Sequence, residues 1–297
     1  MSRSLAAVVP VHNEVGNITP FYERARAVLE TLPGVSWQIV FVNDGSDDGS
    51  LESIRELRSR DGRVSVITLS RRFGYHAVLL AGLSLVAADR YVMIDVDCED
   101  PPELLRDFHG ALEGGADIAY GIRSNRVEPA PITFSRRVFY YLNRWIADSD
   151  IVVWMAEFAM ITRQVRDAIL VPHTTYVFLR AEIAYAGFVR VGVPYVRAAR
   201  TSGKTHYNVL NMTRFAVSGF LAGSTFPLRL ILYVAVVVGI VFPVAVAFGI
   251  GAAELAAVTT LYFVLLSLST IALYLARTYK NGVARPVFII DKNKTYL

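Results

Sequence analysis

Two uncharged segments near the C-terminus constrain the fold of this chain more than any other feature. Residues 230–250 and 255–276 contain no Asp, Glu, Lys or Arg, and only the residues GAAE separate them. A helix as long as the first segment measures about 30 Å, which matches the hydrocarbon core of a bilayer. The pattern predicts a transmembrane helical hairpin with Glu254 in its turn. A hairpin buried in a soluble core is the alternative, but both segments exceed the length of about 18 apolar residues that indicates a membrane span.

Basic residues flank the predicted hairpin. Arg229 precedes it, and Arg277, Lys280 and Arg285 follow it, so the positive-inside rule places both outer ends in the cytoplasm. The first residues, MSRSLAAVVPVHNE, lack the apolar core and cleavage site of a signal peptide, and the N-terminal region is therefore also expected in the cytosol. The mean hydropathy of +0.40 agrees with an integral membrane protein.

Charge and cysteine content exclude further classes of protein. The formal net charge is +4 and the basic residues are scattered, which favours anionic lipid or phosphorylated ligands and predicts no nucleic-acid partner. Cys98 is the single cysteine, so an intrachain disulfide and a multi-cysteine metal site are excluded.

The first 200 residues alternate between short apolar runs and amphipathic stretches. Such alternation predicts an α/β domain with a mostly parallel, doubly wound sheet, in which ligands bind beyond the carboxyl ends of the strands. Neither GxGxxG nor GxxxxGK[ST] is present, so neither a dinucleotide fingerprint nor a P-loop accounts for the pattern. Polar residues follow four of the apolar runs, at residues 10–14, 43–48, 70–74 and 95–99.

The last of these runs, RYVMIDVDCEDPPELL, ends in five acidic residues. Asp100 is expected to cap a helix that begins with proline, and Glu103 to favour the N-terminus of that helix. Asp95, Asp97 and Glu99 would share one face of an extended segment. Three converging carboxylates favour a hard cation, Mg²⁺ or Mn²⁺, although an acidic pattern of this kind is also compatible with a solvated turn. Cys98, on the opposite face, is expected to be a small packing residue.

Five motifs occur in a fixed order: VVPVHNE (8–14), VNDGSDDGS (42–50), LSRRFGYHAVLLAGL (69–83), IDVDCEDPPEL (94–104) and RTSGKTHYN (200–208). Together with the C-terminal hairpin they resemble the family-2 glycosyltransferases of GT-A fold. Within them, the chain is most similar to polyprenyl-phosphate glycosyltransferases, the group that includes dolichol-phosphate mannose synthase and bacterial polyprenyl-phosphate glucosyltransferases. The resemblance implies a GT-A domain at residues 1–205, juxtamembrane amphipathic helices at 206–229, the hairpin at 230–276 and a cytosolic tail at 277–297.

The resemblance also implies roles for individual residues. The nucleotide of a UDP- or GDP-linked sugar donor would be held by Pro10, Glu14, Asp44 and Asp95, with a turn-forming role as the alternative for Asp44. Asp95 and Asp97 match the DxD motif that holds metal and nucleotide, and Glu99 takes a position from which relatives also reach the metal. The phosphate of the acceptor lipid would be held by a set of basic residues: Arg72, Arg123, Arg136, Arg200, Lys204 and His206.

Two positions depart from the family pattern. His206 stands where lysine is usual, and Lys204 shares its face in an extended segment and would supply the charge, while a neutral surface histidine is the alternative. Glu157 stands where many relatives have an aspartate followed by Phe-Arg, and Ala159 replaces that arginine. Glu157 is therefore the candidate for the catalytic carboxylate, either as a base or as a positioning group.

The expected reaction transfers a sugar from a nucleotide diphosphate to a polyprenyl phosphate, and direct in-line attack would invert the anomeric centre. The metal and the cations would stabilise the leaving diphosphate. A phosphomonoester is already largely ionised at pH 7, so a dedicated base is dispensable. Two alternatives remain: a processive polysaccharide synthase, suggested by Asn143-Arg144-Trp145, and a non-catalytic membrane-anchored sugar-nucleotide-binding protein. The oligomeric state stays open, although relatives with this hairpin often self-associate.

Overall fold

The computed structural model describes residues 3–124, 155–171, 178–197, 224–248 and 253–297. The strands are β1 (Arg3–Val11), β2 (Val35–Asn43), β3 (Val64–Thr68), β4 (Arg90–Met93), β5 (Ile118–Arg123), β6 (Met155–Thr162) and β7 (Arg190–Tyr195). The helices are α1 (Val15–Leu29), α2 (Ser50–Arg60), α3 (Tyr75–Leu85), α4 (Leu105–Glu113), α6 (Arg163–Leu170), α7 (Leu179–Tyr185), α9 (Phe226–Ala247) and α10 (Ala253–Val283), with short 3-10 helices η1 (Pro102–Leu104) and η2 (Lys292–Lys294).

The strands form one mixed sheet in the order β3-β2-β1-β4-β6-β5-β7. β1 pairs in parallel with β2 and β4, and β2 pairs in parallel with β3. β6 is antiparallel to both β4 and β5, whereas β5 and β7 are parallel. The predicted mostly parallel sheet is confirmed, with β6 as the strand that departs from it.

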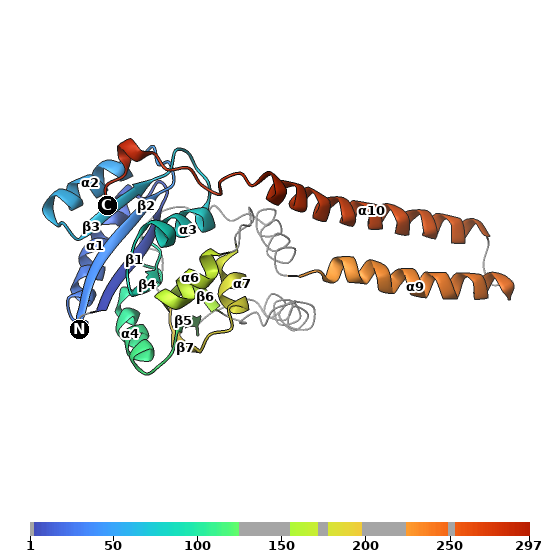
Figure 1. Ribbon diagram of the computed structural model, residues 1–297, viewed down its shortest axis with the longest axis horizontal. Coiled ribbons are helices and arrows are strands. Elements are labelled where there is room, and N and C mark those ends of the chain that lie inside the picture. The colour runs from blue at the N-terminus through green and yellow to red at the C-terminus, as the bar shows by residue number, and fades with distance from the viewer. Residues whose placement is uncertain (1–2, 125–154, 172–177, 198–223, 249–252) are drawn as a thin grey trace.

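Helices cover both faces of this sheet, as Figure 1 shows. One core cluster joins alternate residues of β1 to α1, α2 and α4, and a second joins the intervening residues to α3, α6 and α7. The alternation arises because successive side chains of a strand point to opposite faces. At Gly82 in α3, an added Cβ would lie 2.3 Å from Val8 Cγ1, so only glycine permits this close approach of helix and strand.

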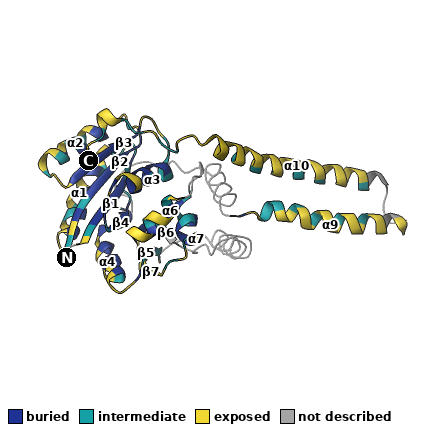
Figure 2. Cartoon of the chain, in the orientation of Figure 1, coloured by how far each residue is buried: buried dark blue, intermediate teal, exposed yellow. Residues whose placement is uncertain are grey.

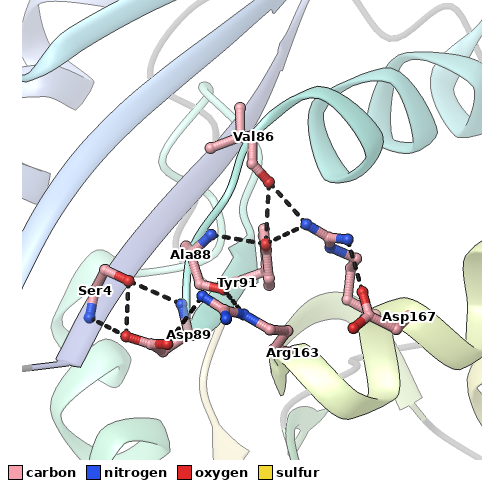
Figure 3. Close-up of polar contacts among 8 residues, drawn as sticks. Ser4, Val86, Ala88, Asp89, Tyr91, Arg163 and Asp167 are labelled. Carbon is pink, nitrogen blue, oxygen red and sulfur yellow. Dashed lines mark hydrogen bonds and ion pairs between the residues drawn. The ribbon is translucent and has the colours of Figure 1, made fainter.

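A polar network ties the amino-terminal edge of the sheet together (Figure 3). Asp89, just before β4, accepts hydrogen bonds from the backbone and hydroxyl of Ser4 at 2.9 and 2.8 Å, and Arg163 Nη2 lies 3.0 Å from its carboxylate. The buried hydroxyl of Tyr91 donates to the carbonyl of Val86 at 3.0 Å. These contacts fix the sheet at the edge opposite the carboxyl ends of β1 and β4, where the polar motifs lie.

α9 and α10 form an antiparallel pair that extends away from the sheet (Figure 1). Their apolar stretches, Phe226–Val244 and Ala256–Val283, are long enough to cross a membrane and are not buried (Figure 2). The alternative of a hairpin buried in a soluble core is therefore wrong. α9 continues through Pro243. Residues 206–223 of the predicted juxtamembrane segment lie outside the described residues, and α9 begins within its last part.

The chain after α10 returns to the sheet. Val66 bridges to Tyr296 and Leu69 to Ile290, both antiparallel, so the C-terminal segment pairs with the edge of β3. Thr68 donates its backbone N–H to Thr295 Oγ1 at 3.0 Å. The C-terminal tail and the α/β domain consequently lie at the same end of the hairpin.

Candidate active site

The candidate site forms where the order of the strands reverses. β1 and β4 are neighbours, because the chain builds β2 and β3 on one side of β1 and then returns with β4 on the other. Ligands of such sheets bind at the carboxyl ends of the strands beside this switch point. Residues 10–14 at the end of β1 and residues 95–100 beyond β4 both lie at this edge.

Antiparallel β6 brings Glu157 to the same edge. Met93 pairs with Ala159, and continuing this register by two residues places Glu157 opposite Asp95. The charge interactions of Asp95 with its acidic neighbours agree with this placement. We use the name acid cluster for Asp95, Asp97, Asp100 and Glu157.

The segment that carries the DxD pattern is a turn. β4 ends two residues before Asp95, Cys98 has a φ of 57°, and the N–H of Glu99 donates to Asp97 Oδ1 at 3.1 Å. The expectation of an extended segment with three acids on one face is therefore wrong, because the Asp97 side chain stabilises a turn at this point. Cys98 packs against the core, as expected.

Asp95 is partly buried and accepts a hydrogen bond from the Tyr75 hydroxyl at 2.8 Å. Burial and, after it, the charges of Asp97 and Asp100 raise the pKa of Asp95 to about 7. Burial and the charge of Asp95 also raise the pKa of Tyr75, so its hydroxyl keeps its proton and remains a donor. The acids thus repel one another, and a cation placed among them would relieve that repulsion.

Glu157 forms an ion pair that the local sequence does not indicate. Its Oε1 lies 2.6 Å from Nε of Arg180 in α7, and the Glu157 side chain is 13% exposed. Ala159, where relatives have arginine, is fully buried in β6. A contact between the rings of His76 and Phe178, 5.2 Å apart, links α3 to the start of α7. A guanidinium group therefore reaches the acid cluster from another element.

Asp100 is buried at the centre of a second polar cluster. Arg123 Nη2 donates to Oδ2 at 3.1 Å, the Tyr195 hydroxyl donates to Oδ1, and Arg197 Nε lies 3.6 Å from Oδ1. Arg123 Nε also donates to the Tyr195 hydroxyl at 3.0 Å. The prediction that Asp100 caps a helix is wrong, since Pro101 occupies the N-cap position of η1 without a side-chain bond. Partners from β5 and beyond β7 hold this carboxylate instead.

Glu99 is buried, and its Oε2 lies 2.5 Å from Arg197 Nη2. Among the described residues, no group of three or more His, Cys, Asp or Glu side chains could hold a metal ion. Mg²⁺, however, often uses one or two carboxylates and takes its other ligands from substrate phosphates and water. The charge of Asp97 raises the pKa of Asp95, so the two carboxylates are near enough to interact, and their role as metal ligands stays a prediction. Glu99 as a third ligand remains a prediction.

Asp44, a candidate for nucleotide binding, holds the loop after β3. Its two carboxylate oxygens accept the backbone N–H groups of Phe73 at 2.6 Å and Gly74 at 2.9 Å. Gly45 has a φ of 67°, and an added Cβ would lie 3.0 Å from Arg72 N, so the two loops touch through backbone. Arg72 is exposed on this loop. Asp44 therefore positions the segment that carries Arg72. Its role in nucleotide binding stays a prediction.

The other candidate residues at this edge are partly exposed. Pro10 is next to the last residue of β1, and Glu14 precedes α1, where its N–H donates to Ser50 Oγ at 3.0 Å. Arg136, Arg200, Lys204 and His206 lie outside the described residues, and their predicted roles stay predictions. Sequence reasoning missed four residues of the site, Tyr75, Arg180, Tyr195 and Arg197; of these, only Tyr75 lies inside a recognised motif.

These elements define a GT-A-like domain followed by two apolar helices. The family model described as Glycosyl transferase family 2 matches residues 6–185. The chain belongs to glycosyl transferase family 2, as its motifs predict.

Relatives match along nearly the whole chain. An uncharacterized glycosyltransferase of Bacillus subtilis, YkcC, is 30% identical over 99% of this chain and 95% of its own length. The prophage bactoprenol glucosyl transferase homolog of Escherichia coli is 30% identical over 98% of this chain and 99% of its own length. The bactoprenol glucosyl transferase of Shigella phage SfV is 29% identical over the same shares.

Solved structures share the fold of the α/β domain. Mannosyl-3-phosphoglycerate synthase from Rubrobacter xylanophilus superposes with a TM-score of 0.52 at 17% identity and covers 74% of this chain and 73% of its own. Glucosyl-3-phosphoglycerate synthase from Mycobacterium tuberculosis has a TM-score of 0.51 at 18% identity and covers 74% of this chain and 79% of its own. The predicted GT-A fold is confirmed.

Proposed function

We propose that this protein transfers a sugar from a nucleotide diphosphate to a polyprenyl phosphate at the cytosolic face of a membrane. The observation that carries the proposal is that a glycosyltransferase domain with an acidic site and a two-helix apolar hairpin occur in one chain. Full-length relatives named bactoprenol glucosyl transferase support the lipid acceptor. An acceptor whose tail stays in the bilayer requires a catalytic domain attached at its surface.

The donor end of the reaction uses Asp95 and Asp97. A divalent cation, Mg²⁺ or Mn²⁺, held by these carboxylates would neutralise negative charge on the leaving nucleoside diphosphate. Tyr75 fixes one oxygen of Asp95 through its hydrogen bond and leaves the other oxygen for a ligand. Asp44 holds the loop after β3 and thereby keeps Arg72, which is predicted to contact the acceptor phosphate, at the same edge of the sheet.

The acceptor end of the reaction uses Glu157 and nearby cations. A phosphomonoester, whose second pKa is about 6, attacks without transferring a proton to the protein at pH 7. Glu157, which is paired with Arg180, therefore acts as a positioning group rather than as an essential base. Direct attack on the anomeric carbon inverts its configuration. Arg123, held by Asp100 and Tyr195, provides a fixed positive charge on the same side.

The proposal includes the orientation of the chain. Arg229 at one end of the hairpin and Arg277, Lys280 and Arg285 at the other favour a cytoplasmic location for the catalytic domain and both termini. The donor carries UDP or GDP, and the oligomeric state stays open.

Thin-layer separation of lipid products tests the reaction. Membranes that contain the protein are incubated with polyprenyl phosphate and, in separate arms, labelled UDP- and GDP-linked sugars, starting with UDP-glucose because relatives are named glucosyl transferases. One labelled glycolipid is expected, and chelation of divalent cations should abolish it. A labelled polymer would instead indicate a polysaccharide synthase, and no product from any donor would indicate a non-catalytic binding protein.

A further inference from the structure

A groove of about 830 Å³ lies between the loop after β3 and the end of α10 nearest the α/β domain. Arg71 and Phe73 contribute one wall, and α10 contributes the other. No residue of the acid cluster lines this groove. It is therefore a separate feature from the candidate active site.

One wall of the groove is a continuous apolar face of α10. Ala272, Ala276, Tyr279 and Val283 line it, and their spacing of three or four residues places them on the same side of the helix. The two alanines leave room beside the helix, and Phe73 closes the groove from the opposite wall. From residue 272 to residue 283 the helix rises about 16 Å, so this apolar surface is long enough to contact much of an acyl chain.

Three cations surround one end of the groove, and its lining contains no acidic residue. Arg71 lies with its guanidinium carbon 4.0 Å from the centre of the Phe73 ring, which holds it beside the groove. Lys280 and Arg285 are exposed on the other side. Such a group of positive charges complements a phosphate.

The position of the groove along α10 matches the boundary of a bilayer. The uncharged part of this helix ends at residue 276, and Arg277 and Lys280 follow. Residues 272–276 would therefore lie at the edge of the hydrocarbon and Lys280 and Arg285 at the level of the headgroups, where basic residues attract anionic lipids.

We infer that this groove binds an anionic phospholipid, with the headgroup phosphate beside Arg71, Lys280 and Arg285 and an acyl chain along α10. The binding rests on the proposed insertion of the hairpin into a membrane, and only its effect on KM rests on the proposed reaction. No residue of the acid cluster lines the groove, so a phosphate held here is separate from the group that would attack the sugar. The bound lipid is therefore distinct from the acceptor.

The lipid would also act on the candidate active site through the loop. Phe73 lines the groove with its side chain, while its backbone N–H donates to Asp44 at 2.6 Å. A headgroup that contacts Arg71 thus restrains the segment that carries Arg72. Anionic lipid should consequently lower the KM for the sugar nucleotide.

Native mass spectrometry of the full-length protein tests the binding directly. The protein is titrated in detergent with phosphatidylglycerol, phosphatidylcholine and polyprenyl phosphate, and the double variant Arg71→Gln/Arg285→Gln is compared with wild type. Each cation removed should weaken phosphatidylglycerol binding by about fivefold, or about 25-fold for both. Binding of polyprenyl phosphate should be unchanged. Arg60→Gln/Arg106→Gln, which removes two exposed charges outside the groove, is the matched control.

Equal phosphatidylglycerol binding by wild type and both double variants would overturn the inference. So would a loss of polyprenyl-phosphate binding in Arg71→Gln/Arg285→Gln with phosphatidylglycerol binding intact, because the groove would then belong to the acceptor. Thermal unfolding followed by circular dichroism establishes that each variant is folded. The single variant Arg285→Gln repeats the comparison of phosphatidylglycerol binding with wild type and changes only one residue of the segment that follows α10.

Discussion

Replacement of Asp100 by serine tests whether this residue caps a helix or holds a buried ion pair, because the two roles predict losses of stability of different size. A residue that caps a helix would tolerate the exchange, because serine and aspartate are nearly equivalent at that position. In the structure, the Asp100 side chain is only 2% exposed and contacts Arg123, Tyr195 and Arg197. Removal of one partner from a buried ion pair costs about 3–5 kcal/mol, because it leaves the other charge uncompensated.

The expected result for Asp100→Ser is a fall in the melting temperature of about 6–20 °C, since 1 kcal/mol corresponds to about 2–4 °C in a domain of this size. Unfolding of the full-length protein in detergent is followed by circular dichroism. Glu103→Gln is the control, because it breaks an exposed pair with Arg24 and should cost less than about 1 kcal/mol. Asp100→Ser/Arg123→Met should recover part of the loss, because the unpaired buried guanidinium is gone.

A shift of less than about 2 °C for Asp100→Ser would refute this reasoning. It would mean that the carboxylate contributes no more than a helix cap and that Arg123 is stabilised by other groups. If Asp100→Ser causes a large loss of stability that Arg123→Met does not reduce, Asp100 stabilises the protein through contacts other than its ion pair with Arg123.

Three further predictions concern activity and pH. Asp97→Asn should abolish transfer in the thin-layer assay while Glu157→Gln leaves measurable product; complete loss in both would contradict the division of roles. Arg180→Gln should lower kcat/KM at least about tenfold, and Glu157→Gln/Arg180→Gln should be no worse than the poorer single variant, because both residues act through one pair; additive losses would argue against coupling. Burial, followed by the charge of Arg90, lowers the pKa of His109, so the unfolded chain binds more protons than the folded protein below about pH 6.5. Stability should therefore fall from about pH 7.5 to about pH 5.5, with a slope of up to about 1.4 kcal/mol per pH unit for this group. The His109→Gln variant should lose less stability than the wild type over this pH range. Equal changes of melting temperature with pH in the two proteins would refute the assignment to His109.

Much of the α/β domain follows from local patterns. One of the amphipathic stretches, residues 50–60, forms α2 with the same bounds, and the apolar runs before residue 98 overlap β1 to β4. These elements can be predicted from the sequence because each buries one periodic set of side chains. Residues 95–100 were harder to predict, since a hydrogen bond from the N–H of Glu99 to Asp97 ends the extended conformation.

The composition of the site depends on contacts that local patterns do not contain. Arg123 is 23 residues from Asp100 and Tyr195 is 95 residues from it, so neither partner is visible from the helix-start signal. Arg180, the partner of Glu157, comes from α7, whereas Glu157 lies in β6. Its pairing with Glu157 depends on β6 running antiparallel to β4, which no motif specifies.

In the proposed membrane-bound orientation, the pairing of the C-terminal segment with β3 limits the height of the candidate active site above the bilayer. α10 ends at Val283 and the first bridged residue is Ile290, so seven peptide units join the membrane helix to the sheet. At most about 3.6 Å per residue, this connection spans no more than about 25 Å. The catalytic domain cannot rise further from the membrane unless the segment detaches from β3. A fusion partner added after Leu297 would begin beside Arg58. It would test this attachment, because a partner that detaches the segment from β3 should change catalysis without contacting the candidate active site.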